Sequence, residues 1–205
     1  MLSDRLIVLS ILALLIFVPT GCKKPNEPPP YKLFEDKSQV IQVARDVLGS
    51  DVAFANSGYY LSDSLKSIVA GVEVSEKNQF GIKFYLIDWV EGEFKEVYAT
   101  EVMEGSFTKC LVDKIKFSDL PHELLYYNSQ GYFLGSGGGE VYSHVINFQA
   151  KENYTAHLTV ASRGDIYLEL SNNIKIPMLK TFFVSYFKRE YPTLIVINSD
   201  STPNI

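Results

Sequence analysis

The spacing of apolar residues changes along the chain from a helical period to strand-like runs and back again. From Ser38 to Leu48 apolar residues recur at helical spacing and Gly49 follows as a stop signal, which predicts an amphipathic helix. Between 176 and 192 a wide aromatic stripe recurs at the same spacing, and Pro192 ends it. We therefore expect one helix at each end of the folded part.

Short apolar runs separated by Gly, Ser, Asn and Glu fill the chain between these helices and also follow the second one. We expect strands at 67–74, 80–90, 93–103, 106–117, 131–135, 140–148, 154–162, 165–171 and 193–198. The triplets at 91–93 and 104–106 supply the glycine that tight hairpins favour. The segment 149–153 is suited to a further hairpin between its two flanking strands.

A short helical stretch is expected within 118–128, where Ser118 or Asp119 can cap a helix and Pro121 suits its first turn. Otherwise strands dominate and do not alternate with helices as βαβ units would. The pattern predicts an α+β fold, a largely antiparallel β-sheet with an N-terminal helix and a C-terminal amphipathic helix. We assign a single globular domain to 32–198 and a polar tail to 199–205.

The N-terminal region holds an uncharged apolar run from Leu6 to Val18, followed at once by Pro19 and two small residues. A helix that spans a membrane needs roughly 20 apolar residues, whereas about 10 to 14 is typical of a signal-peptide core. A proline followed by small residues leaves an extended backbone that a signal peptidase can bind. The run therefore predicts a cleaved targeting segment rather than a membrane span.

The motif Val18-Pro19-Thr20-Gly21-Cys22 resembles the lipobox of bacterial lipoproteins, although that family usually has Leu where this chain has Pro19. The resemblance implies removal of the signal peptide 1–21 and attachment of acyl chains such as palmitate to Cys22. Each buried CH₂ contributes about 0.8 kcal/mol, so two or more chains form a lasting membrane anchor. The alternatives are an ordinary secretory signal or an uncleaved anchor, with Cys22 incidental.

The residues after the cysteine predict a tether over 22–31, with four prolines and two lysines in its first part. Proline-rich linkers favour an extended conformation that rises about 3.1 Å per residue. By the sorting rule of diderm lipoproteins, Lys23 in place of Asp implies the outer membrane rather than the inner one. We therefore expect a domain in the cell envelope, exposed to the periplasm, with membrane lipid as its partner through Cys22.

Composition narrows the class of function. The formal net charge is −5 and no basic run occurs, which argues against nucleic acid as a partner. With Cys22 blocked by lipid, Cys110 has no partner for an intramolecular disulfide. A lone cysteine in an apolar run is most often a small buried hydrophobic residue rather than a reactive thiol.

A glycine-rich stretch, GYFLGSGGGEVYSHV at 131–145, is the first candidate for ligand binding. Gly137 and Gly138 would let the backbone approach a ligand closely. No Lys-Ser/Thr pair follows as a phosphate-binding loop requires, and Glu140 stands where a GxGxxG motif needs its last glycine. A flexible hairpin turn is the alternative interpretation.

Histidines on the two following strands extend this candidate site. Glu140, Tyr142 and His144 share one face of a strand because side chains alternate with a period of two. His157 lies on the next strand, so the two histidines could approach each other across the hairpin. The possible ligand-binding residues are therefore Gly137, Gly138, Glu140, Tyr142, His144 and His157.

Catalytic and metal-binding motifs do not support a stronger assignment. Metal sites on helices use spacings such as HxxxH, which are missing, so we expect no metal or other cofactor. No GxSxG motif occurs, and the SxxK matches at Ser106 and Ser185 lack the accompanying elements of penicillin-recognising enzymes. We expect no catalytic residue, and the alternative for the histidines is two half-exposed strand positions.

The stretch from Leu120-Pro121 to Asn128, with GSGGGEVY after it, is similar to a part of the SUKH superfamily of bacterial immunity proteins. Those proteins have a helix begun by Leu-Pro, an Asn-Gly turn and a glycine-rich segment that leads into a strand. Here Asn128-Ser129-Gln130-Gly131 replaces the Asn-Gly pair. The resemblance implies an immunity or inhibitor protein.

These observations lead to one expectation about function and two alternatives. We expect a membrane-anchored lipoprotein whose domain binds a protein or glycan of the envelope, or has a structural role, without catalysis. Tyrosines at 59–60, 126–127 and 132 are candidates for a binding patch, because aromatic residues are enriched in interfaces. The alternatives are a small metal-dependent hydrolase that uses Glu140, His144 and His157, and a SUKH-like immunity or inhibitor protein.

Overall fold

The computed structural model describes residues 28–76, 79–129, 132–133 and 138–198. Its helical elements are η1 (Tyr31–Glu35), α2 (Lys37–Leu48), η2 (Phe107–Lys109) and α3 (Pro177–Glu190). Its strands are β1 (Phe54–Gly58), β2 (Ser67–Glu76), β3 (Gln79–Val90), β4 (Glu93–Ala99), β5 (Leu111–Ile115), β6 (Leu124–Asn128), β7 (Tyr132–Phe133), β8 (Gly138–Asn147), β9 (Glu152–Ala161), β10 (Ile166–Leu170) and β11 (Ile195–Asn198). The signal peptide 1–21, Cys22 and most of the predicted tether, and the tail 199–205, lie outside the described residues.

The strands form two sheets, and the α+β expectation with a helix near each end is confirmed. The small sheet has four strands in the order β1-β2-β3-β4. The large sheet has seven strands in the order β11-β10-β9-β8-β6-β5, with β7 paired to β8. Among the described strands, every pairing is antiparallel except that of β10 with β11.

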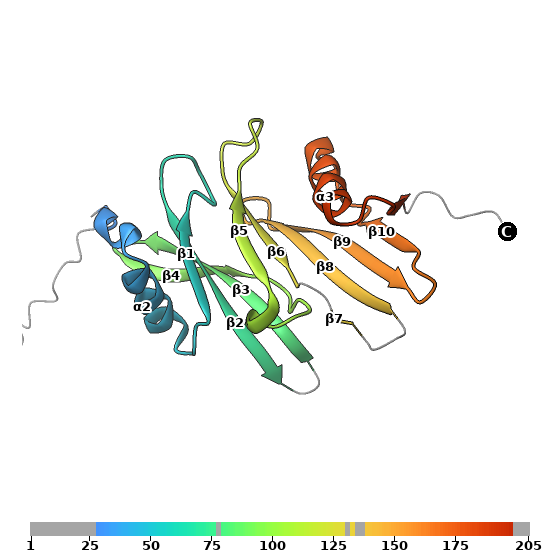
Figure 1. Cartoon of the computed structure of the whole chain (residues 1–205). Helices are drawn as coiled ribbons and strands as arrows, with labels where there is room; N and C mark the ends of the chain where they lie inside the picture. The colour runs from blue at the N-terminus through green and yellow to red at the C-terminus, as the bar shows by residue number, and fades with distance from the viewer. Residues whose placement is uncertain (1–27, 77–78, 130–131, 134–137, 199–205) are drawn as a thin grey trace, which may run out of the picture.

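The layers follow one another from α2 through the small sheet and the large sheet to α3 (Figure 1). Three groups of buried apolar side chains fill the spaces between them. Val40 and Ala44 of α2 pack on Ile68 and Ala70 of β2. At the other end, the helix α3 packs on the large sheet through Leu179, Phe183 and Phe187.

Local sequence signals account for the limits of α2. The Asp36 side chain accepts a hydrogen bond from the Ser38 backbone N–H at 2.9 Å, which caps the helix N-terminus. Gly49 ends the helix with a φ of 61°, a left-handed conformation that glycine adopts without steric cost. Among the described helices, none is both long and apolar enough to cross a membrane.

The contact between the two sheets is offset, and this offset positions the candidate site. Leu125 and Tyr127 of β6 and Ile146 of β8 pack on Val69, Phe84 and Leu86 of the small sheet. Within the described part of the chain, no member of this buried middle cluster comes from β9, β10 or β11. These strands bury only their other face, against α3. The remaining face of β9, β10 and β11 is not covered by the small sheet.

Several expectations about local structure are wrong. Residues 124–128 form the fully buried strand β6 instead of a helix, because pairing with β5 and β8 outweighs the proline signal. The parallel β10-α3-β11 connection is a βαβ unit, which the sequence pattern did not predict. The strand expected at 93–103 ends at Ala99, and the strand expected at 106–117 is divided into η2 and β5.

The expected hairpin at 91–93 is confirmed and the one at 104–106 is wrong. Glu91 and Gly92 join β3 to β4 with φ angles of 55° and 84°, as in a two-residue hairpin turn. Residues 104–106 instead carry the chain from the small sheet to the large one. The hairpin across 149–153 is present between β8 and β9.

The segment between the sheets is fixed to the small sheet by Phe107 and Glu73. The ring of Phe107 stacks on Phe54 and lies against Gly71, where a β-carbon would be 2.2 Å from the Phe107 Cζ. The Glu73 carboxylate accepts hydrogen bonds from the Ser106 hydroxyl at 2.6 Å and the Phe107 N–H at 2.7 Å. Half-buried Cys110 packs beside the same cluster, and burial raises the pKa of its thiol, with a contribution from the Glu73 charge.

Gly71→Ala should destabilise the domain, because the added methyl group displaces the Phe107 ring. We expect a loss of about 1 to 3 kcal/mol in the free energy of unfolding, as for other overpacked cores, measured by urea denaturation. The Gly71→Ala/Phe107→Leu double variant should lose less than the sum of the single variants, because leucine leaves room for the methyl group. Strict additivity would contradict the proposed contact.

Candidate functional site

The uncovered face of the large sheet brings together side chains from four strands. Tyr142 of β8 lies opposite His157 of β9, which in turn lies opposite Glu169 of β10. In the next row of the same face, Glu140 of β8 lies opposite Thr159, which lies opposite Tyr167. At the edge, Ile195 and Ile197 of β11 lie opposite Tyr167 and Glu169. We call this set the open face, defined as Glu140, Tyr142, His157, Thr159, Tyr167, Glu169, Ile195 and Ile197.

Tyr142 and His157 form the centre of the open face. Their rings stack with centroids 4.3 Å apart and planes inclined by only 4°. The Tyr142 hydroxyl donates a hydrogen bond to Glu140 Oε2 at 3.2 Å, and the His157 Nε2 lies 3.6 Å from the same oxygen. Burial and then the hydrogen bond to Glu140 raise the pKa of Tyr142, so the phenol remains a neutral donor. The Glu140 carboxylate thus accepts a hydrogen bond from the tyrosine and lies near the imidazole nitrogen.

His144 lies at the boundary between the open face and the middle cluster, and it is only 4% exposed. Its Nδ1 is 3.1 Å from the Thr155 hydroxyl and 3.2 Å from the Asn153 side-chain nitrogen. An amide nitrogen only donates, which makes Nδ1 the acceptor and places the proton of a neutral imidazole on Nε2. That nitrogen faces Glu104 Oε2 at 3.3 Å.

Glu104 reaches this histidine from the segment between the two sheets. The ring of Tyr127 stacks on His144 at 5.8 Å, and its hydroxyl donates to the Glu104 backbone carbonyl. The hydrogen bond with His144 lowers the pKa of Glu104 against the opposing effect of burial, and the charges of both site histidines add to the lowering. Glu104 therefore stays ionised beside the open face.

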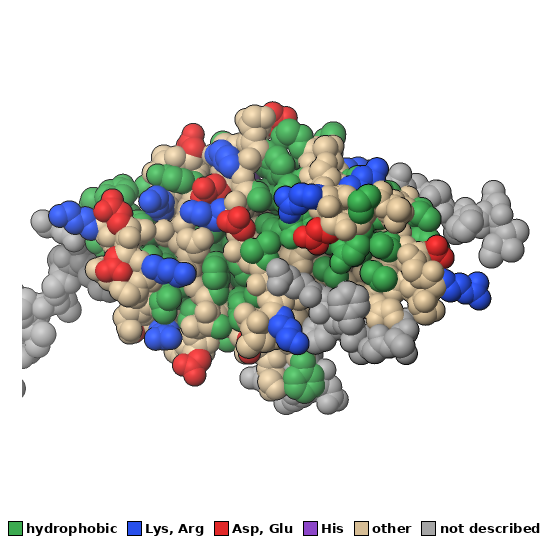
Figure 2. All heavy atoms as spheres, viewed as in Figure 1, with side chains coloured by type: hydrophobic (Ala, Val, Ile, Leu, Met, Phe, Trp, Pro, Cys, Tyr) green, Lys and Arg blue, Asp and Glu red, His purple; other side chains and the backbone are tan. Residues whose placement is uncertain are grey.

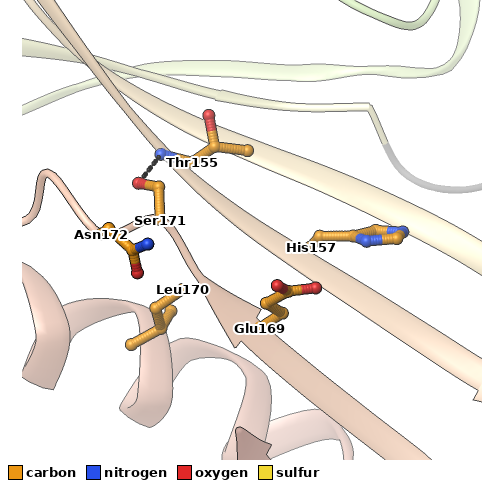
Figure 3. Close-up of a pocket in the computed structure, with 6 residues that line it drawn as sticks. All are labelled: Thr155, His157, Glu169, Leu170, Ser171 and Asn172. Carbon is orange, nitrogen blue, oxygen red and sulfur yellow. Dashed lines mark hydrogen bonds between the residues drawn. The ribbon is translucent and has the colours of Figure 1, made fainter. Parts of the chain in front are cut away.

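A shallow cavity of about 240 Å³ adjoins the open face at the end of β10. Its lining residues are Thr155, His157, Glu169, Leu170, Ser171 and Asn172. Figure 3 shows His157 and Glu169 projecting from neighbouring strands on one side, with the hydrogen bond from the Thr155 N–H to the Ser171 hydroxyl on the other. The cavity thus combines a carboxylate, hydroxyl and amide groups, and an imidazole.

Part of the expected set lies together: Glu140 and Tyr142 contact His157 across the hairpin, whereas His144 lies opposite Thr155. Glu140, Tyr142 and His144 share one face of β8. Gly138 has a φ of 113°, and a β-carbon there would lie 2.1 Å from the Val160 carbonyl oxygen. Its backbone therefore approaches strand β9, while Gly137 lies outside the described residues. A ligand-binding role for this set stays a prediction.

Sequence reasoning missed the acidic residue Glu104 beside the open face and five members of the face itself, namely Thr159, Tyr167, Glu169, Ile195 and Ile197. Glu169 alternates with Tyr167 in β10 and thus carried a period-two signal that pointed to the same face. Glu104 carried no such signal, because its contact with His144 depends on how the two sheets pack.

The expected tyrosine patch is wrong for three of its members. Tyr60, Tyr126 and Tyr127 are buried, with exposed fractions of 0%, 2% and 0%. Tyr126 packs on Phe182 and Tyr186 of α3, and Tyr127 packs on Phe84 of β3. The tyrosines that reach the open face are Tyr142 and Tyr167 instead, both half-buried.

The polar groups at His144 form a chain that resembles a catalytic arrangement only in part. The Thr155 hydroxyl, the His144 imidazole and the Glu104 carboxylate follow one another, as a nucleophile, a base and an orienting group would. However, the Thr155 N–H already donates to Ser171, so this backbone donor does not serve a developing oxyanion. Within the described ranges, no three His, Cys, Asp or Glu side chains are grouped so that they could hold a metal ion.

Comparison of the chain with protein-family models, curated proteins and solved structures finds no match. The case for a function therefore depends on the geometry of the open face.

Glu104→Gln should lower stability in a pH-dependent manner. Because the folded-state pKa of Glu104 is lowered, its contribution is complete above the ordinary pKa of 4.5 and is lost as pH falls through the folded value. The side chain is 54% exposed, so we expect a difference of roughly 0.5 to 1 kcal/mol near neutral pH. Urea unfolding of both proteins from about pH 7 to about pH 3 tests this. A difference that grows on acidification would contradict the assignment.

Proposed function

We propose that this chain is a bacterial lipoprotein, anchored in the envelope by acylated Cys22, whose domain binds an envelope partner through the open face without catalysing a reaction. One observation carries the binding role. Among the described residues, no layer covers the open face, which presents two tyrosines, a histidine and carboxylates beside a cavity. Aromatic residues at a surface of this kind are typical of protein interfaces.

The position of the chain's first described residues supports the anchoring role. The folded domain begins with η1 directly after the proline-rich segment, with no intervening linker. In Figure 1 this end lies beside α2, whereas β9, β10 and α3 lie at the opposite end of the molecule. A tether at the α2 end places strands β9 and β10, which carry much of the open face, at the end of the molecule far from the membrane.

The charge distribution supports a protein or glycan rather than nucleic acid as the partner. The formal net charge is −5. Figure 2 shows basic and acidic side chains interspersed over one side of the molecule, without a continuous basic area among its described residues. Nucleic-acid binding needs a basic stripe or patch that neutralises phosphates.

Cys22→Ala should release the protein from the membrane or leave its precursor unprocessed. We expect the native N-terminal peptide to carry the mass of attached acyl chains and the native protein to need detergent for extraction. Mass spectrometry of that peptide and membrane fractionation measure both. Native protein that keeps its initiator methionine, or that a salt wash alone removes from membranes, would contradict the anchor.

A photo-crosslinking residue placed at Tyr167 should capture an envelope partner in intact cells. The matched control position is Val97 on β4, which is 39% exposed at the opposite end of the molecule. We expect a discrete adduct from position 167 that is absent from position 97. Identical adducts from both positions, or none from either, would argue against the open face as the binding surface.

A further inference from the structure

We infer that the open face recognises a basic side chain, Lys or Arg, carried by an extended peptide segment of a protein partner and flanked by apolar residues. This inference depends on the proposed binding function and specifies the chemistry of its partner. Charge, cavity size and the apolar edge of the sheet support it separately.

Among the described residues, the fixed charges on and beside the open face are all negative. Glu140 and Glu169 lie on it, and Glu104 stands at its border beside His144. As the described residues define it, the open face contains no Lys or Arg. The nearest basic side chain in sequence, Arg163, is exposed in the turn that joins β9 to β10. Three carboxylates around a surface without a fixed cation attract a positively charged group and repel an anionic one.

The rings of the face favour the same kind of group. Lys and Arg side chains bind over the faces of aromatic rings, with guanidinium groups also stacking on them. Tyr142 stacks flat on His157 and donates a hydrogen bond to Glu140, so its ring and a carboxylate lie together on the face. Tyr167 lies in the neighbouring row, next to Ile195 of β11. A cation here meets an aromatic surface and a carboxylate together.

The cavity has the dimensions of a single side chain. Its volume of about 240 Å³ lies below the roughly 300 to 1,000 Å³ of pockets that enclose small-molecule ligands. The His157 ring supplies an aromatic wall, and Glu169, Ser171 and Asn172 supply acceptors, while the Leu170 side chain itself is buried against α3. A long basic side chain matches this arrangement, because its methylene stem packs on apolar surface while its charged head remains with polar groups.

The edge of the sheet determines what flanks the basic residue. Ile195 and Ile197 of β11 are 52% and 38% exposed, and both lie beside the acidic rows. β11 is the outermost strand on this side and carries no charged residue. Apolar side chains next to the basic one would cover these isoleucines. The peptide that fits best therefore alternates basic and apolar residues.

The test uses the full acylated chain in detergent and two fluorescent peptides of the sequence Val-Lys-Val-Lys-Val, one with free lysines and one with acetylated lysines. Fluorescence anisotropy measures binding. We expect the cationic peptide to bind at least about tenfold more tightly than the neutral one, with an affinity that falls as salt rises.

Variants distinguish the effect of the open-face carboxylates on peptide binding from the effect of the protein's overall charge. The Glu140→Gln/Glu169→Gln protein should lose about tenfold or more in affinity for the cationic peptide. The control Glu35→Gln/Glu96→Gln removes the same charge from exposed positions near α2 and should bind like the native chain. Glu169→Gln alone leaves the contacts of Glu140 intact and covers the case in which the double variant fails to fold. Equal losses in the site and control proteins would overturn the inference.

Other outcomes identify a different occupant. Tight binding to phosphatidylethanolamine vesicles but not to the cationic peptide would make the ligand a lipid amine and would overturn the peptide inference. A concentration-dependent dimer that Glu169→Gln abolishes would replace the partner by a second copy of this chain. If the peptides do not bind while the crosslinker at Tyr167 still captures a partner, the binding function stands and the cationic chemistry is wrong.

Discussion

The offset packing of the small sheet on the large one is the constraint on which the rest of the structure depends. Phe84 and Leu86 of β3 are buried against Leu125 and Tyr127 of β6, and this contact extends only as far as β8. Burial of these side chains supplies the main favourable free energy between the two sheets. Because the small sheet has four strands and the large one seven, full coverage from this position does not occur. The open face is the part of the large sheet that the small sheet does not cover.

His144 marks the line at which the apolar interface ends. A buried imidazole is unfavourable unless its nitrogens have partners. Asn153 and Thr155 contact Nδ1 from the neighbouring strand, and the Glu104 carboxylate, from the segment that joins the sheets, lies 3.3 Å from Nε2. The same contacts fix the border of the open face, since they hold the connecting segment against β8. Glu104 thus has two roles, because it faces the buried His144 at the edge of the interface and adds a negative charge to the border of the open face.

The sequence was sufficient for the part of the site that depends on one hairpin. Alternation in β8 and the short connection to β9 placed Glu140, Tyr142 and His157 together, as the register confirms. Prediction from sequence failed for the strand β6, which is covered on both faces. Tyr126 and Tyr127 are consecutive and both buried, because β6 lies between the small sheet and α3. Such a strand shows no alternation, so its residues were interpreted as a short helix and an exposed patch. The contact of Glu104 with His144 could not be predicted from the sequence either, because no local pattern encodes how two sheets pack.

The two ends of the molecule suit different surroundings, and electrostatics connects this with the proposed anchor. Lys23 and Lys24 of the predicted tether would be attracted to anionic headgroups, whereas Glu104, Glu140 and Glu169 would be repelled by them. Screening limits both effects to about 8 to 10 Å at ordinary ionic strength, so they act only near the membrane. In a domain held at its α2 end, as proposed, β9 and β10 lie far from the anchor, so this repulsion disfavours only orientations that tilt them towards the lipid. The carboxylates then stay available to the proposed partner, with little competition from the lipid surface.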